Sequence, residues 1–204
     1  MIAVRALGLT VAVAGLLPSV LLAAGDIDTC RTALDVRSMR LGERVRVDVR
    51  LELPVPAPVV WEVMTDYGQA ARFIRNLRSS EVQTLAPQRQ RVRQLGWLGW
   101  GGVGVEIRTD YEVKLEPERW RVTGQLVGGD VKSMEMVARL NPTGASRTVL
   151  DYAVTTDPGA WVPALLVEGV LRGHARASFE DLAAEMRRRA PACSVAHAPQ
   201  EAKS

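Results

Sequence analysis

The chain has 204 residues, of which 47% are hydrophobic, so it is long enough for one domain with a substantial core. Its formal net charge is only +3, and its 26 lysine and arginine residues are spread along the chain. Nucleic-acid-binding proteins gather basic residues on one surface, so we expect no nucleic acid among the partners.

Residues 1–24 have the pattern of a signal peptide. Arg5 precedes an almost wholly apolar run over 6–24, and the small residues at 23–25 are of the kind that signal peptidase accepts. We therefore expect cleavage of this segment and export of the protein, to the periplasm. A retained membrane anchor is the alternative, because the apolar run is close to the length that spans a bilayer.

The chain has two cysteines, Cys30 and Cys193, one near each end of the expected mature protein. The first lies in an N-terminal extension over 25–42, and the second in an Ala/Pro/Gln-rich tail over 191–204 that we expect to be disordered. In an oxidising compartment the pair can form a disulfide, which would contribute about 4–5 kcal/mol in the chain-entropy model. A disulfide and two free thiols both remain open.

Residues 44–53 alternate between apolar and charged side chains, which predicts a half-buried strand. Asp48 and Glu52 lie among the arginines of this region, so we expect a solvated outer face there and not a basic binding surface. The arginines concerned are Arg37, Arg40, Arg44, Arg46 and Arg50. Prolines end the strand, and two short helices are predicted over 58–67 and 70–74.

Further segments with the apolar alternation of strands follow, joined by short turns, which favours an antiparallel sheet. They cover residues 79–85, 89–95, 103–115, 120–126, 134–140 and 148–154. With the strand at 44–53, the sheet would have about seven strands. Residues 161–188 then predict one long helix with a buried stripe of Leu171, Ala175, Phe179, Leu182 and Met186.

This order of elements resembles the helix-grip fold, an α+β fold in which a curved antiparallel sheet surrounds a long C-terminal helix. The segments Val55–Tyr67, Phe73–Leu77, Trp120–Gly124 and Trp161–Pro163 are similar to the START-like polyketide cyclase/dehydrase superfamily (SRPBCC), whose relatives include coenzyme Q-binding proteins. The resemblance covers a START-like domain over 43–190. It implies an apolar cavity between the sheet and the long helix. It is more specific for fold than for function, since the superfamily contains lipid carriers, receptors, cyclases and hydrolases.

Residues Gly99–Gly104 have the G-x-G-x-x-G spacing of dinucleotide sites, but a strand follows this segment where such sites need a helix. We therefore expect a glycine-rich hairpin loop. Trp97 and Trp100 flank it. We favour partial burial at the rim of the sheet over a lid at the cavity mouth or a tip that touches a membrane.

Residues suited to catalysis are scarce. The chain has no H-E-x-x-H, C-x-x-C or G-x-S-x-G motif, so we expect no metal, no cofactor and no common nucleophile site. His174 and Tyr152 are the modest candidates for a base that reaches the cavity, although a structural or exposed histidine is favoured. Asp66 and Arg72 either hold the head of a ligand or are ordinary charges at helix ends.

We expect nine residues to line the cavity, because they lie on inward strand faces, on the short helices or on the apolar half of the long helix. They are Trp61, Phe73, Tyr111, Trp120, Met134, Met136, Tyr152, Leu166 and Val170. Burying about ten ligand methylenes against such walls would yield roughly 8 kcal/mol before the costs of binding, so no catalytic residue is needed for affinity.

The sequence therefore predicts an exported START-like protein that binds or carries an apolar small molecule, such as a lipid, a quinone or a polyketide-like compound. A transient contact with a membrane surface would suit such a carrier. Two alternatives remain open. One is a cyclase or dehydratase that uses the same cavity, and the other is an interaction module of the cell envelope whose interior is filled by side chains.

Overall fold

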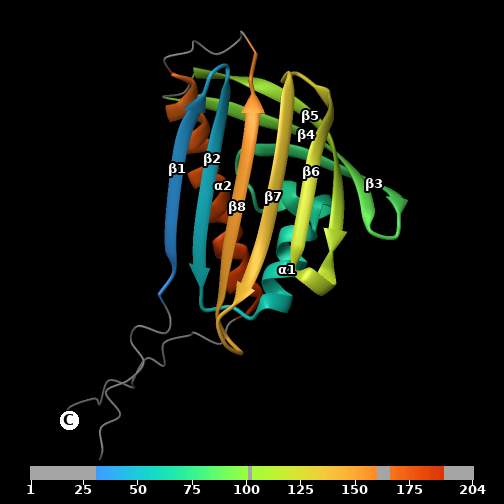
Figure 1. Cartoon of the computed structure of the whole chain (residues 1–204), viewed down its shortest axis with the longest axis vertical. Coiled ribbons are helices and arrows are strands. Elements are labelled where there is room, and N and C mark those ends of the chain that lie inside the picture. The colour runs from blue at the N-terminus through green and yellow to red at the C-terminus, as the bar shows by residue number, and fades with distance from the viewer. Residues whose placement is uncertain (1–30, 101–102, 160–165, 191–204) are drawn as a thin grey trace, which may run out of the picture.

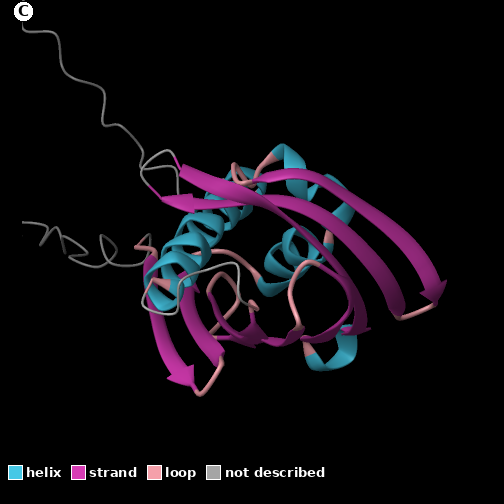
Figure 2. Cartoon of the chain, turned by 90° about the horizontal axis from the view of Figure 1, so that it is seen from above, coloured by secondary structure: helices cyan, strands magenta, loops and turns pink. Residues whose placement is uncertain are grey.

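The computed structural model of the protein describes residues 31–100, 103–159 and 166–190. Eight antiparallel strands form one curved sheet, and a long helix lies against its concave side (Figure 1, Figure 2). The strands are β1 (Ala33–Leu41), β2 (Arg44–Leu53), β3 (Leu77–Ala86), β4 (Arg89–Trp100), β5 (Val103–Glu116), β6 (Arg121–Gly129), β7 (Ser133–Pro142) and β8 (Thr148–Asp157). The helices are α1 (Ala57–Thr65) and α2 (Val167–Arg189), with 3-10 turns η1 (Tyr67–Arg72) and η2 (Pro117–Arg119).

The strand order is β1-β2-β8-β7-β6-β5-β4-β3, and every pair is antiparallel. After β2 the chain forms α1 and η1, enters the far edge of the sheet as β3, and returns strand by strand until β8 pairs with β2. The predicted helix-grip architecture, with two short helical segments after the strand at 44–53, is confirmed. In the described residues no helix combines the length and apolarity needed to cross a bilayer.

The sheet has one strand more than the seven expected. Strand β1 pairs along its whole length with β2, so the boundary predicted at residue 43 falls inside a β-hairpin. The strand escaped prediction because it is an edge strand in which only Val36 is buried, and its apolar residues show no regular alternation. The expected signal peptide, both cysteines and the tail lie outside the described residues, as do positions 160–165 at the predicted start of the long helix.

The core lies between the concave face of the sheet and one side of α2. Leu51 on β2, Leu150 on β8 and Leu140 on β7 lie opposite one another in register, and all three are buried. The predicted stripe of α2 faces them, with Phe179 and Met186 buried. The helix packs mainly against β1 and β2 at one edge of the sheet, so the cavity lies between the helix and the inner faces of strands β4 to β8.

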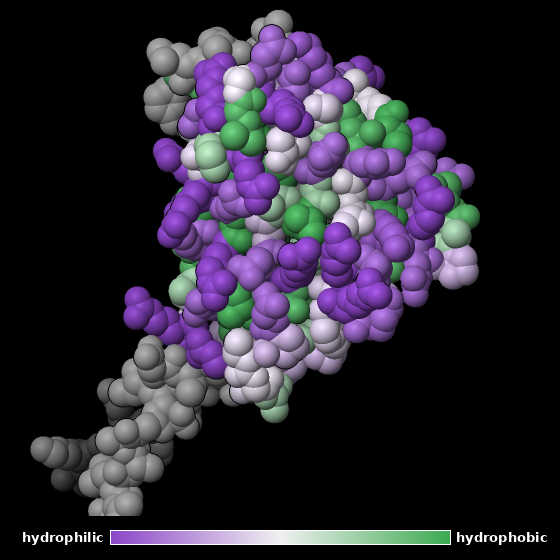
Figure 3. All heavy atoms as spheres, in the orientation of Figure 1, coloured by the Kyte–Doolittle hydropathy of each residue, from purple (hydrophilic) through white to green (hydrophobic). Residues whose placement is uncertain are grey.

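The convex face of the sheet is mostly polar, with scattered apolar patches, as Figure 3 shows. Arg46 donates to Asp48 at 2.9 Å, and Arg50 donates to Asp151 on the neighbouring strand at 3.1 Å. These side chains are about half exposed, and exposed ion pairs contribute little to stability. The arginines of this face therefore belong to a solvated surface, as the sequence predicted.

Two glycines with positive φ differ in how closely a neighbouring strand approaches them. Gly129 has a φ of 118°, and a Cβ at that position would collide with the carbonyl oxygen of Arg108 on β5. Gly144, in the turn between β7 and β8, has a φ of 119° but has nothing within 4 Å of the same atom. We predict that Gly144→Ala lowers the free energy of unfolding by about 1 kcal/mol and that Gly129→Ala lowers it by about 3 kcal/mol or more, because only the second adds a backbone clash.

Urea unfolding of both variants measures the difference. Both substitutions carry a similar backbone cost, so Gly144→Ala serves as the matched control. Equal losses of stability would show that the close approach of β5 to Gly129 is not important.

Candidate functional site

A cavity separates the concave face of the sheet from α1, η1 and α2, and it has two adjoining lobes. The helical lobe, of about 210 Å³, reaches Val63, Tyr67 and Phe73 near the short helices. The rim lobe, of about 260 Å³, reaches Trp97, Leu98 and Leu171. The two lobes share lining residues at a waist, namely Leu77, Gln94, Gly96, Tyr111, Met136, Tyr152, His174, Ser178 and Phe179.

The lining is mostly apolar, and the space is large enough for a small molecule. A dry apolar cavity of about 150 Å³ already accepts benzene, and each lobe is larger than that. The interior is therefore not filled by side chains, which argues against the interaction-module alternative.

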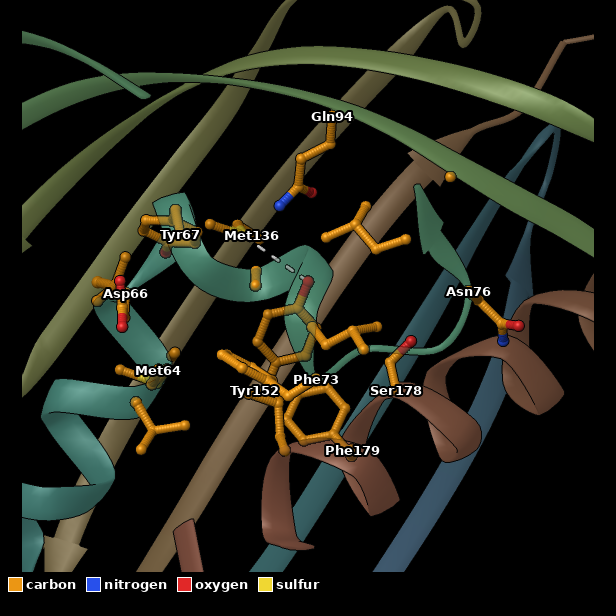
Figure 4. A pocket seen from close by; sticks show the side chains of 18 of the residues that line it. Met64, Asp66, Tyr67, Phe73, Asn76, Gln94, Met136, Tyr152, Ser178 and Phe179 are labelled. Carbon is orange, nitrogen blue, oxygen red and sulfur yellow. Dashed lines mark hydrogen bonds between the residues drawn. The ribbon is translucent and has the colours of Figure 1, made fainter. Parts of the chain in front are cut away.

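Five of the nine predicted lining residues border this cavity. They are Phe73, Tyr111, Met134, Met136 and Tyr152. Figure 4 shows Phe73, Met136 and Tyr152 around the helical lobe, with Phe179 of α2 beside them. That these residues bind a ligand stays a prediction.

The other four do not border either lobe. The rings of Trp61 and Trp120 pack edge to face against each other, with their centres 5.7 Å apart. Trp120 follows η2 with a φ of 49°, so it is a turn residue and not an inward strand position. Leu166, at the start of α2, is 48% exposed, and Val170 lies beside the stripe that faces the sheet. The prediction for Leu166 and Val170 was wrong because it took every apolar residue near the start of this helix as facing the cavity. The sheet covers α2 on one side only.

Several residues that line the cavity were not predicted from the sequence. Gln94 lies two residues after the buried Val92, so strand periodicity places both on one face. Ser178 directly precedes Phe179 of the predicted stripe. Tyr67 directly follows the C-cap of α1. A polar residue within or beside an apolar stripe is the signal that would have identified the first two.

All three tyrosines of the chain border the helical lobe. Tyr67 comes from η1, Tyr111 from β5 and Tyr152 from β8. The rings of Tyr67 and Tyr111 meet edge to face, with their centres 6.2 Å apart. Burial raises the pKa of each hydroxyl well above the usual value for tyrosine, so all three are protonated donors at neutral pH.

The sequence matches a family described as "Polyketide cyclase / dehydrase and lipid transport" over residues 53–183. The chain belongs to this family. No curated protein matches the sequence. The match covers the sheet from the end of β2, the short helices and most of α2, so it includes the elements that form both lobes.

Solved structures of START-like proteins share the fold. A STAR-related lipid transfer protein from Xanthomonas axonopodis is 15% identical with a TM-score of 0.63, and the match covers 80% of this chain and 97% of that chain. The Zhui aromatase/cyclase from a Streptomyces species is 20% identical with a TM-score of 0.63, covering 74% and 98% of the two chains. A START superfamily protein from Mycobacterium smegmatis is 14% identical with a TM-score of 0.61, covering 71% and 98%.

In this member of the polyketide cyclase and lipid transport family, His174 borders both lobes and is not a surface histidine. Burial lowers the pKa of its imidazole, so the side chain is neutral at neutral pH. The second candidate base, Tyr152, borders the same cavity. The structure therefore leaves the cyclase alternative open.

Asp66 and Arg72 differ in their surroundings. Asp66 borders the helical lobe, but its carboxylate accepts a hydrogen bond from Arg189 of α2 at 3.2 Å. Arg189 also donates to Glu62 and to Glu185, each at 2.8 Å, so this cluster joins α1 to the end of α2. Arg72 is exposed. Asp66 is thus held mainly by a contact between helices.

The glycine-rich segment is a β-hairpin, as predicted. Gly99 at the end of β4 pairs with Gly104 at the start of β5, and no helix follows. Trp97 is half-buried beside the rim lobe, and the guanidinium of Arg78 lies 5.7 Å from its ring centre. Gly101, Gly102 and the side chain of Trp100 lie outside the described part of the chain.

Glu185 gives the helix junction a pH dependence. It is only 8% exposed, and a hydrogen bond from Arg188, helped by Arg189, lowers the pKa of its carboxyl to about 2. Because the folded-state pKa lies below the usual value of 4.5, ionised Glu185 stabilises the fold above about pH 4.5, and this contribution is lost as the pH falls towards 2.

We predict that Glu185→Gln lowers the free energy of unfolding by about 1–2 kcal/mol at neutral pH, a range reduced for screening of the exposed Arg188. The difference from the unmodified protein should shrink as the pH is lowered from 5 towards 2. Glu180→Gln, on the exposed side of the same helix, is the control. A difference that does not change with pH would contradict the assignment.

Proposed function

We propose that the protein binds or carries an apolar small molecule, such as a lipid, a quinone or a polyketide-like compound, in the cavity between its sheet and α2. The observation that carries this proposal is the pair of adjoining lobes, of about 210 and 260 Å³, with mostly apolar walls. Ligand pockets of small molecules have this character, with a few polar groups that orient the guest. The tyrosine hydroxyls, Gln94 and His174 are such groups here.

The proteins that this chain is similar to support either a carrier function or an enzymatic one. The family description joins polyketide cyclases and dehydrases with lipid transport, and similar structures include a lipid transfer protein and an aromatase/cyclase. Binding energy from apolar contacts alone permits micromolar affinity. A carrier therefore needs no group beyond those that line the cavity.

Native mass spectrometry of protein purified from its own host tests the proposal. We expect a bound apolar species, or uptake of one from a panel of lipids, quinones and aromatic polyketides. If the purified protein contains no bound apolar species and takes up no member of the panel, the binding function is contradicted.

We also propose that the carrier works after export to the periplasm, on the basis of the signal-peptide pattern over 1–24. A transient contact with a membrane surface would give a lipid guest a route into the cavity. Sequencing the N-terminus of the protein from a periplasmic fraction tests export, and the mature chain should begin just after Ala24. An intact N-terminus in a membrane fraction would favour the anchor instead.

A cyclase or dehydratase is the second candidate, because His174 and Tyr152 both border the cavity. A neutral imidazole is the form that can take a proton from a reactive chain. If this function is correct, the protein will convert a short linear poly-β-ketone to an aromatic ring product. His174→Ala will then abolish conversion while the polyketone still binds.

A further inference from the structure

Three tyrosines add hydroxyl groups to the mostly apolar wall of the helical lobe. They come from three separate elements, and these are the only tyrosines in the chain. The ring of Tyr152 also packs against Phe179, with the ring centres 5.0 Å apart. Figure 4 shows Tyr67 and Tyr152 on either side of Met136 in the helical lobe. Packing against neighbouring rings therefore holds the hydroxyls in place.

These hydroxyls have donor capacity to spare. Among the described residues, neither Tyr67 nor Tyr111 has a hydrogen-bond partner for its hydroxyl, and Tyr152 donates only to the Sδ of Met136 at 3.7 Å. A thioether sulfur is a weak acceptor. A tyrosine hydroxyl that donates to no protein atom is free to donate to an acceptor oxygen on a guest.

Among the residues that the structure describes, the lining of the cavity offers no cation to a charged guest. Apart from the tyrosines, the ionisable side chains among the described residues that line either lobe are His174 and Asp66. His174 is neutral, and the carboxylate of Asp66 already accepts a hydrogen bond from Arg189. A carboxylate or phosphate here would lose its hydration without gaining a counter-ion, which is expensive.

From this arrangement we propose that the ligand is uncharged, with an apolar body and at least one carbonyl or hydroxyl oxygen that accepts hydrogen bonds from Tyr67, Tyr111 and Tyr152. Anionic lipids such as fatty acids are rejected. This inference rests on the proposed binding function and narrows it to one ligand class. The lobe volumes accommodate a body of two to three fused rings, since about 150 Å³ already holds one.

Three fluorescent probes with the same ring system test the inference at neutral pH. Anthracene measures apolar binding alone, 2-acetylanthracene adds a neutral acceptor, and anthracene-2-carboxylate adds a charge. We expect the ketone to bind more tightly than the hydrocarbon by about fivefold for each hydrogen bond formed. The carboxylate should bind at least about tenfold more weakly than the hydrocarbon.

Tyrosine-to-phenylalanine variants identify the donors. Each of Tyr67→Phe, Tyr111→Phe and Tyr152→Phe keeps the ring and removes the hydroxyl, so the preference for ketone over hydrocarbon should fall, and the triple variant should lose it. The ratio of the two affinities within one variant is unaffected by a partial loss of folded protein. Phe73→Leu is the control, because it alters the apolar wall and should weaken both probes alike.

The outcomes separate this inference from the function on which it rests. If none of the probes binds, the cavity is not a binding site, and both proposals fail. If anthracene binds but the carboxylate binds as well as the ketone, the uncharged-ligand inference is overturned while the binding function stands. A ketone preference that survives in the triple variant would show that the tyrosines are not the donors.

Discussion

Replacing Ser178 with leucine will weaken the binding of an apolar probe about 50-fold without lowering the melting temperature. Ser178 borders both lobes at the waist, and Figure 4 shows it beside Phe179 at the edge of the helical lobe. A leucine there takes space that about three ligand methylenes would occupy, and each is worth about 0.8 kcal/mol. The new side chain fills a void and favours the helix, so stability should be kept or raised.

Fluorescence titration with anthracene, together with a thermal melt, measures both effects. Arg176→Leu introduces the same side chain on the exposed side of the same helix, and it should leave binding unchanged. Unaltered affinity in the Ser178→Leu variant would mean that ligands do not occupy the waist. The ligand site would then lie within one lobe away from the waist, or elsewhere on the protein.

Leu150→Ala will lower the free energy of unfolding by about 3 kcal/mol, which corresponds to a fall in melting temperature of roughly 6–12 °C. Leu150 has no exposed surface and lies in register between Leu51 and Leu140 at the centre of the sheet. Removing its side chain leaves a hole that tightly packed neighbours cannot close.

Leu171→Ala is the matched control, because it makes the same chemical change at the cavity wall. Leu171 lines the rim lobe, so part of its surface already lacks packing partners. We expect this variant to lose about 1 kcal/mol and to keep its fold with a larger cavity. Equal losses in chemical denaturation would indicate that the rim lobe is closed and packed in solution.

The central strands were predictable because their periodicity is strong. Val45, Val47 and Val49 alternate with charged residues, and the structure places them in β2 with their side chains buried. The stripe of α2 was equally clear, because spacings of three and four residues place its members on one face. Strand β1 was not predictable in this way, since an edge strand buries few of its side chains.

The site was predictable only in part. Tyr111, Met136 and Tyr152 lie on inward strand positions, and period two was enough to place them at the cavity. Trp120 was misplaced because a left-handed backbone turn interrupts the period just before β6. Whether an inward residue lines a cavity or belongs to the packed core depends on what lies opposite it, and a local pattern contains no information about that.

The sequence by itself determined the order of the elements from β2 onward, the antiparallel sheet and the helix that packs against it. Each of these follows from the local alternation of apolar and polar residues. The tertiary structure decided that β8 pairs with β2, that two lobes remain open beside the packed leucines, and that three tyrosines from distant segments share one of them. The physical reason is that a cavity is the volume left after all elements have packed together, so it depends on their relative positions and not on any one segment.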